Sequence, residues 1–229
     1  MAKTAFGQPL PIPLHRNARL RQWLGEKVAG DAAMGDLVWR RIVHMSGALV
    51  LLYFVFPGDF WVTPWPQTTT VILLLLLEAG LFIELFRHLG YVDVPVIRPY
   101  ERDRIAGYCW YAMGLTFAVL LFPEPVAVAV VLGAAFVDPL IGEFRRRGVP
   151  RAYSGLAFGA YALMAGGSLY ALGGWAALPA VVGALVAAAV ALAVERLRAP
   201  FVDDDFTMPV VPGLVLLLVA MLWPGGVGG

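Results

Sequence analysis

The sequence has few charged residues and a single cysteine. Asp, Glu, Lys and Arg make up only 14% of its 229 residues, whereas soluble domains carry about 25%. The lone Cys109 excludes an intramolecular disulfide and any cysteine-based zinc or iron–sulfur site. The formal net charge is only +1. The chain therefore lacks the basic field of a nucleic-acid-binding protein, and we expect no nucleic-acid partner.

The familiar catalytic motifs are missing as well. The sequence contains no Gly-x-x-x-x-Gly-Lys-Ser/Thr phosphate loop, no His-Glu-x-x-His zinc motif and no Gly-x-Ser-x-Gly nucleophile elbow. Lys3 and Lys27 are its only lysines, and both precede the first apolar run. A retinal Schiff base within a helix bundle is therefore excluded.

The sequence is unusually rich in apolar residues. Hydrophobic residues make up 60% of it and the mean hydropathy is +0.75, so lipid is the expected solvent for much of the chain. A spanning helix needs about 20 mostly apolar residues. The sequence therefore predicts an all-α, polytopic integral membrane helix bundle with about seven transmembrane helices, six or eight remaining open. The predicted spans lie near 42–57, 67–87, 105–122, 125–142, 154–173, 175–195 and 207–224.

The charges between the spans predict the orientation. All 17 Lys and Arg residues fall before the first span or after the second, fourth and sixth spans, counting Arg87 at the end of the second span. With seven spans they share one side, which the positive-inside rule makes cytoplasmic. We expect residues 1–39 to form a cytoplasmic N-terminal tail, partly disordered or carrying a surface helix, and residues 40–229 to form the transmembrane domain. The expected location is the plasma membrane, with the active site on its cytoplasmic side.

One acidic residue lies near the predicted cytoplasmic end of the fourth span, where an ionised side chain is energetically unfavourable. Asp138 is about one to two turns inside that end by helical rise, and Pro139 removes a backbone donor beside it. Freed carbonyl oxygens next to a carboxylate favour a Mg²⁺ site. The alternative is that Asp138 pairs with an arginine from a neighbouring span. Arg145, Arg146 and Arg151 follow, either as a topology signal or as ligands of phosphate groups.

A second group of acids precedes the last span. Asp203, Asp204 and Asp205 are consecutive, and three neighbouring carboxylates repel one another unless a cation or several donors stabilise them. Capping of the following helix explains one of the three. We therefore expect at least one to bind a metal ion or a nucleotide. Glu195 lies just upstream, at the end of the sixth span.

Further ionisable residues lie at the ends of the first two spans. Arg41 and His44 are three residues apart and so share one face of a helix. Glu84 and His88 are four residues apart, a spacing that favours a local ion pair. The role of Glu78, about 9 Å deeper by helical rise, is left open.

Four segments together carry a family resemblance. They read Arg40-Arg-Ile-Val-His44, Arg98-Pro-Tyr-Glu101 before Gly107-Tyr-Cys-Trp-Tyr111, Val137-Asp-Pro-Leu-Ile-Gly-Glu-Phe-Arg-Arg146, and Asp203-Asp-Asp-Phe-Thr-Met-Pro209. In this order they resemble the dolichol kinase/phytol kinase family of polyprenol kinases, which is related to the phosphatidate cytidylyltransferases. The aspartate segment is the most specific part. Where that family usually has a Lys-Ser/Thr-x-Glu-Gly-Ser element, this chain reads Arg151-Ala-Tyr-Ser-Gly-Leu156.

The resemblance implies a Mg²⁺-dependent membrane kinase. Such an enzyme transfers the γ-phosphate of CTP, or of another nucleoside triphosphate, to the hydroxyl of a long-chain isoprenoid alcohol. It further implies that Asp138 and Asp204 hold Mg²⁺ and that Asp203, Asp204 or Glu101 acts on the alcohol hydroxyl. The alternatives left open are a CTP-dependent cytidylyltransferase acting on a lipid phosphate, and a non-catalytic membrane protein or transporter of the same fold; a homodimer is also left open. The residues expected to bind the nucleotide are Arg41, His44, Arg98, Arg145, Arg146, Arg151, Gly155 and Glu195.

Overall fold

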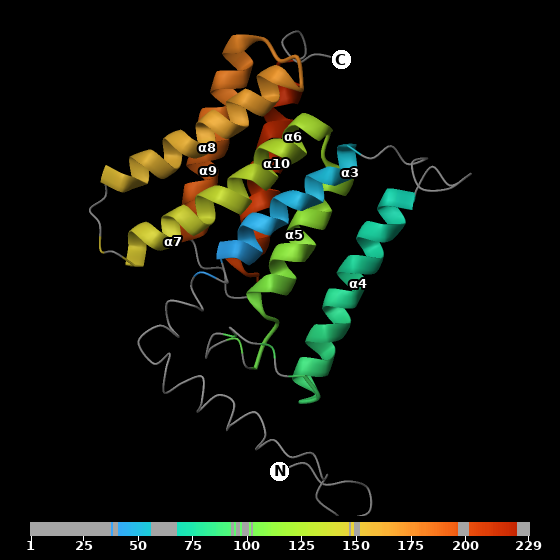
Figure 1. Cartoon of the computed structure of the whole chain (residues 1–229). Coiled ribbons are helices and arrows are strands. Elements are labelled where there is room, and N and C mark those ends of the chain that lie inside the picture. The colour runs from blue at the N-terminus through green and yellow to red at the C-terminus, as the bar shows by residue number, and fades with distance from the viewer. Residues whose placement is uncertain are drawn as a thin grey trace, which may run out of the picture. The chain divides into compact units, whose positions relative to one another are not determined.

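The computed structural model describes residues 38, 41–55, 68–92, 94, 97, 101, 103–146, 148, 152–196 and 202–223. Over these residues the chain is helical and contains no strand, which confirms the all-α prediction for the described part (Figure 1). The first helix, Arg41–Val55, includes the 3₁₀ turn η1 (Gly47–Leu51) and the short α3 (Leu52–Val55). The other elements are α4 (Thr68–His88), α5 (Gly107–Leu121), α6 (Glu124–Leu132), the π-helical turn η3 (Gly133–Val137), α7 (Asp138–Arg146), α8 (Ala152–Ala171), α9 (Ala177–Arg196) and α10 (Asp204–Leu222).

Helices long and apolar enough to cross a membrane account for four of the predicted spans. They are Thr68–His88, Glu124–Phe144, Ala177–Arg196 and Asp204–Leu222. The helices Arg41–Val55 and Gly107–Leu121 are apolar but shorter, and α8, which corresponds to the fifth predicted span, is not among the four. The number of spans and the side of the N-terminus therefore stay predictions.

The chain divides into two units, Met1–Arg40 and Arg41–Gly229. In the first unit only Val38 is described, so the predictions for the N-terminal tail lie outside the described residues. All of the helices named above belong to the second unit, and the following description concerns that unit.

The core is built around helices with small residues on their inner faces. On α9 these residues recur every three or four positions, so that one stripe faces α8 and α10. A side chain added at Gly183 would meet Leu216 and Trp175 at 3.2 and 3.3 Å, which shows how closely the helices approach. The buried small residues of this stripe are Ala180, Gly183, Ala184, Ala187, Ala188 and Ala191.

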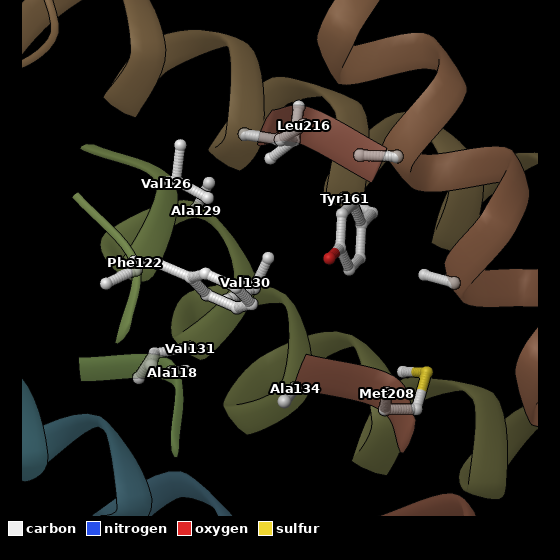
Figure 2. Packing of buried hydrophobic residues seen from close by; sticks show 14 of the residues in the cluster. Ala118, Phe122, Val126, Ala129, Val130, Val131, Ala134, Tyr161, Met208 and Leu216 are labelled. Atoms are coloured by element: carbon white, nitrogen blue, oxygen red, sulfur yellow. The ribbon is translucent and has the colours of Figure 1, made fainter. Parts of the chain in front are cut away.

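The helix α6 lies inside the bundle, whereas α4 lies at its edge. In the continuous helix Glu124–Phe144, which begins with α6, half of the residues in the most apolar 18-residue stretch are buried. In the most apolar 18-residue stretch of α4 the buried share is 6%. Figure 2 shows Val126 and Val130 of α6 beside Tyr161 of α8 and Leu216 of α10. By contrast α4 packs mainly against α5 (Figure 1).

A π-helical turn separates α6 from α7 and sets the direction of α7. The turn η3 is closed by i→i+5 bonds and so holds one residue more than an α-helical turn. Gly133 at its start leaves space for the ring of Tyr161, because an added side chain would meet that ring. Pro139, just past the turn, has no amide hydrogen to donate to the carbonyl oxygen of Ala135. Asp138 therefore begins α7 in a register different from that of a continuous α-helix.

Candidate functional site

One histidine and two aspartates from three different helices meet at one end of the bundle. His44 comes from the first helix, Asp138 from the start of α7 and Asp205 from the first turn of α10. His44 Nδ1 lies 3.9 Å from Asp138 Oδ2, and His44 Nε2 lies 3.5 Å from Asp205 Oδ1. One possible ligand atom of each residue lies within 4.8 Å of the others. We call these three residues the acid–histidine cluster. Asp138, far from the aspartate segment in the sequence, therefore lies close to it in the structure.

Tyr111 on α5 fixes the position of His44. Its hydroxyl donates a hydrogen bond of 2.7 Å to the main-chain oxygen of His44. Its ring packs against the imidazole with the ring centroids 4.5 Å apart. A side chain added at Gly47, one turn further along the first helix, would meet the Tyr111 ring. The glycine therefore allows the first helix to approach α5 closely enough for these contacts.

The start of α10 fixes the position of Asp205. Asp203 is the N-cap residue, and its Oδ1 accepts a hydrogen bond of 3.2 Å from the main-chain nitrogen of Asp205. The prediction that capping explains one of the three aspartates is thus confirmed. The resemblance implies that Asp204 holds the metal ion, and that assignment stays a prediction; in this structure Asp205 is the aspartate of the three that groups with His44 and Asp138. The sequence pattern could have indicated this inward position, because Asp205 shares the helical spacing of five buried residues of α10: Met208, Pro209, Pro212, Gly213 and Leu216.

Glu101 extends the acid–histidine cluster toward α5. Its side chain is buried, with 4% of the residue exposed. A side chain added at Gly107 would meet Asp205 Oδ2 and would lie 3.3 Å from Glu101 Oε1. The carboxylates of Glu101 and Asp205 therefore both lie against the start of α5, where only a glycine leaves room for them.

The aspartates at the start of α10 form a second, overlapping group. One carboxylate oxygen from each of Asp203, Asp204 and Asp205 lies within 4.8 Å of the others. Asp203 and Asp204 are half-buried, whereas Asp205 is buried. Asp205 belongs to both groups. Asp204, which the resemblance assigns to the metal, therefore lies next to the acid–histidine cluster.

Arg41 lies beside the cluster and pairs with an acid. Its guanidinium donates a hydrogen bond to Glu143 Oε2 of α7. This ion pair joins the same two helices as the contact between His44 and Asp138. Its role in nucleotide binding stays a prediction, and in this structure the pair ties the first helix to α7.

The other predicted nucleotide-binding residues are described only in part. Glu195 is buried at the end of α9, and Gly155 on α8 is exposed with open space around it. Arg98 and Arg151 lie outside the described residues. Arg145 and Arg146 belong to the last turn of α7, but their side chains are outside the described part.

The donor set of the acid–histidine cluster fits a divalent cation. It offers an imidazole nitrogen and two carboxylates from three separate elements. His44 Nδ1 is buried and has no hydrogen-bond partner among the described residues, although it points toward Asp138. Mg²⁺ is commonly held by one or two carboxylates together with the phosphates of a substrate, and imidazole also suits several transition metals.

No protein-family model matches this chain, and neither does any curated protein or solved structure. The family resemblance of the four sequence segments therefore remains a prediction.

Proposed function

We propose that the chain is an integral membrane kinase that transfers the γ-phosphate of CTP, or of another nucleoside triphosphate, to the hydroxyl of a long-chain isoprenoid alcohol. The observation that carries the proposal is the convergence of His44, Asp138 and Asp205 at one end of an apolar helix bundle. Ionised groups at membrane depth are costly and are retained mainly where they have a function. A lipid alcohol would keep its chain among the helices and present its hydroxyl at this end.

We also propose a seven-span topology with a cytoplasmic N-terminus in the plasma membrane, and the cluster supports the span count in this proposal. His44 begins the first predicted span, Asp138 ends the fourth and Asp205 begins the seventh. With seven spans these three positions face one side of the membrane, and it is the side that carries the Lys and Arg residues. Loss of one span between them would place them on opposite sides. Their close approach therefore favours the count of seven.

Phosphoryl transfer needs mainly positioning and charge neutralisation. In the proposed site His44, Asp138 and Asp205 hold the divalent cation, and Asp204 borders them. A bound Mg²⁺ would neutralise charge on the triphosphate. Glu101, next to Asp205, is suited to accept the proton of the alcohol hydroxyl.

The protein's own cations take the remaining negative charge of the nucleotide. In the proposal Arg145, Arg146 and Arg151 bind the phosphates, since they follow Asp138 on the cytoplasmic side. Replacement of both Arg145 and Arg146 by Gln should raise the KM for the nucleotide while leaving the KM for the alcohol unchanged. Unchanged nucleotide kinetics would leave these arginines as a topology signal only.

The decisive experiment follows a labelled phosphate. The full chain in lipid nanodiscs is incubated with γ-labelled CTP or ATP and Mg²⁺, in one reaction with a panel of prenols and in another with a lipid phosphate. A kinase places the label in an organic-extractable monophosphate, whereas a cytidylyltransferase acting on a lipid phosphate releases it as pyrophosphate. Asp205→Asn should abolish transfer. Glu78→Gln, the same chemical change on an exposed acid of α4, serves as the matched control and should leave the transfer rate unchanged.

A further inference from the structure

A second polar network in the described part of the chain is centred on Glu84 of α4. This glutamate is buried, with 5% of the residue exposed. Its Oε1 accepts hydrogen bonds from Arg87 Nη2 at 2.6 Å and from the main-chain nitrogen of Ala106 at 2.8 Å. Its Oε2 accepts from Arg87 Nε at 2.7 Å and from the Tyr108 hydroxyl at 2.6 Å. Arg87 Nη2 also donates to the main-chain oxygen of Arg104 at 2.8 Å. We call these residues the Glu84 network.

The Glu84 network ties the start of α5 to α4, at the edge of the bundle. Three points of the segment 104–108 are tied to α4 in this way: an oxygen of Arg104, the nitrogen of Ala106 and the hydroxyl of Tyr108. Ala106 is the N-cap position of α5 and is fully buried. Without Glu84 its amide would have no acceptor from α4, and an unsatisfied buried amide costs about 1–3 kcal/mol.

The same segment forms one wall of the acid–histidine cluster. Gly107 follows Ala106 directly and lies against the carboxylates of Asp205 and Glu101. The main-chain oxygen of Glu101 accepts a hydrogen bond from the nitrogen of Arg104 at 3.4 Å. A shift of the start of α5 would therefore move the glycine that accommodates Asp205.

We propose that Glu84 is a positioning residue for the acid–histidine cluster, which it reaches through its hydrogen bonds to the segment 104–108. The inference rests on the proposed function, since it assumes that the cluster binds a divalent cation. In this proposal Glu84 acts only through its hydrogen bonds to the segment and contacts neither the cation nor the substrate. Its carboxylate fixes where α5 begins, and that position sets the space available to Asp205.

The competing explanation is that Glu84 only attaches α4 to the bundle. The structure provides a control for this, because α4 is also attached near its other end. The Tyr53 hydroxyl and Thr70 Oγ1 form a hydrogen bond of 3.0 Å, about 21 Å from Glu84 by helical rise. Thr70→Val removes that attachment without touching the segment 104–108. A residue that merely holds α4 in place would behave like Thr70.

The test measures cation binding separately from catalysis. Mn²⁺ binding to the full chain in nanodiscs is followed by electron paramagnetic resonance for the wild type, Glu84→Ala, Glu84→Gln and Thr70→Val, with the folded fraction matched by circular dichroism. We expect Glu84→Ala to weaken Mn²⁺ binding at least tenfold and Thr70→Val to change it less than twofold. Glu84→Gln keeps an oxygen acceptor for Ala106 and should recover part of the affinity.

Each remaining outcome overturns a distinct statement. Wild-type Mn²⁺ affinity in folded Glu84→Ala, or an equal loss in Thr70→Val, would reduce Glu84 to an attachment of α4 and leave the kinase proposal untouched. Weakened Mn²⁺ binding in Glu84→Ala together with no label transfer by the wild type would support the positioning role and overturn the kinase. Wild-type binding no tighter than that of Asp205→Asn would overturn both.

Discussion

The hydroxyl of Tyr111 donates a 2.7 Å hydrogen bond to the main-chain oxygen of His44, while the two rings pack with centroids 4.5 Å apart. One side chain of α5 thus fixes both the backbone and the imidazole of the first helix. The contact matters because the first helix carries only one member of the acid–histidine cluster. The relative position of the first helix and α5 therefore decides whether His44 reaches the two aspartates.

We expect Tyr111→Phe to loosen His44 without removing the ring contact. The loss of one buried hydrogen bond should lower the free energy of unfolding by about 1–2 kcal/mol and weaken Mn²⁺ binding several-fold. Thermal unfolding in detergent and electron paramagnetic resonance measure the two effects. If both quantities stay at their wild-type values, the hydrogen bond does not position the imidazole.

A second prediction concerns the space beside Asp205. Gly107→Ala places a methyl group against Asp205 Oδ2, so the carboxylate has to move, and we expect Mn²⁺ affinity to fall at least tenfold. Gly80→Ala on α4 is the matched control, because nothing lies within 4 Å of the added methyl group there. Titration with Mn²⁺ compares the two variants. An equal affinity in both would show that Asp205 has room to move without losing its partners.

A third prediction tests the packing of α5 against α10. A methyl group at Gly114 would lie 2.9 Å from Pro209 Cγ and 3.0 Å from the main-chain oxygen of Phe206. Because a backbone atom cannot yield easily, Gly114→Ala should lower the free energy of unfolding by about 1–3 kcal/mol. Gly159→Ala on α8 meets nothing within 4 Å and should be neutral or slightly stabilising, since alanine favours helices. Similar melting temperatures of the two variants would contradict the close approach.

A fourth prediction concerns Tyr161 in the core of the bundle. The residue is fully buried, and its hydroxyl has no hydrogen-bond partner among the described residues. Removal of an unsatisfied buried hydroxyl by Tyr161→Phe should therefore raise the free energy of unfolding by about 1 kcal/mol. The melting temperature in detergent shows whether the substitution stabilises or destabilises the protein. A lower melting temperature would mean that a buried water satisfies the hydroxyl.

The helices could be predicted closely because each apolar run ends at charged residues, proline or glycine. The span predicted near 67–87 is α4, Thr68–His88, and the one near 175–195 is α9, Ala177–Arg196. The first helix contains the 3₁₀ turn Gly47–Leu51, which nothing in its apolar run indicated. The turn begins at Gly47, which packs against the ring of Tyr111, a tertiary contact that hydrophobic periodicity does not report.

The site could be predicted in part. The acidic segments drew attention to Asp138 and to the three aspartates because charge is energetically unfavourable beside lipid, whereas the proximity of Asp205 to His44 depends on the inner face of α10, which only the folded chain shows. The Glu84 network was missed. Sequence spacing pointed to His88, which does lie 3.5 Å from Glu84 Oε1. Two of the hydrogen-bond donors come from Ala106 and Tyr108, whose approach to α4 only the folded chain reveals.

The π-helical turn Gly133–Val137 limits how this protein can change during evolution. Each residue added to or removed from a helix turns everything beyond it by about 100°, so the direction of Asp138 depends on the length of the chain between Pro125 and Pro139. Substitutions of similar volume along α6 leave that length intact. Single-residue insertions and deletions there do not, and they would swing Asp138 away from His44 even if every helix still formed.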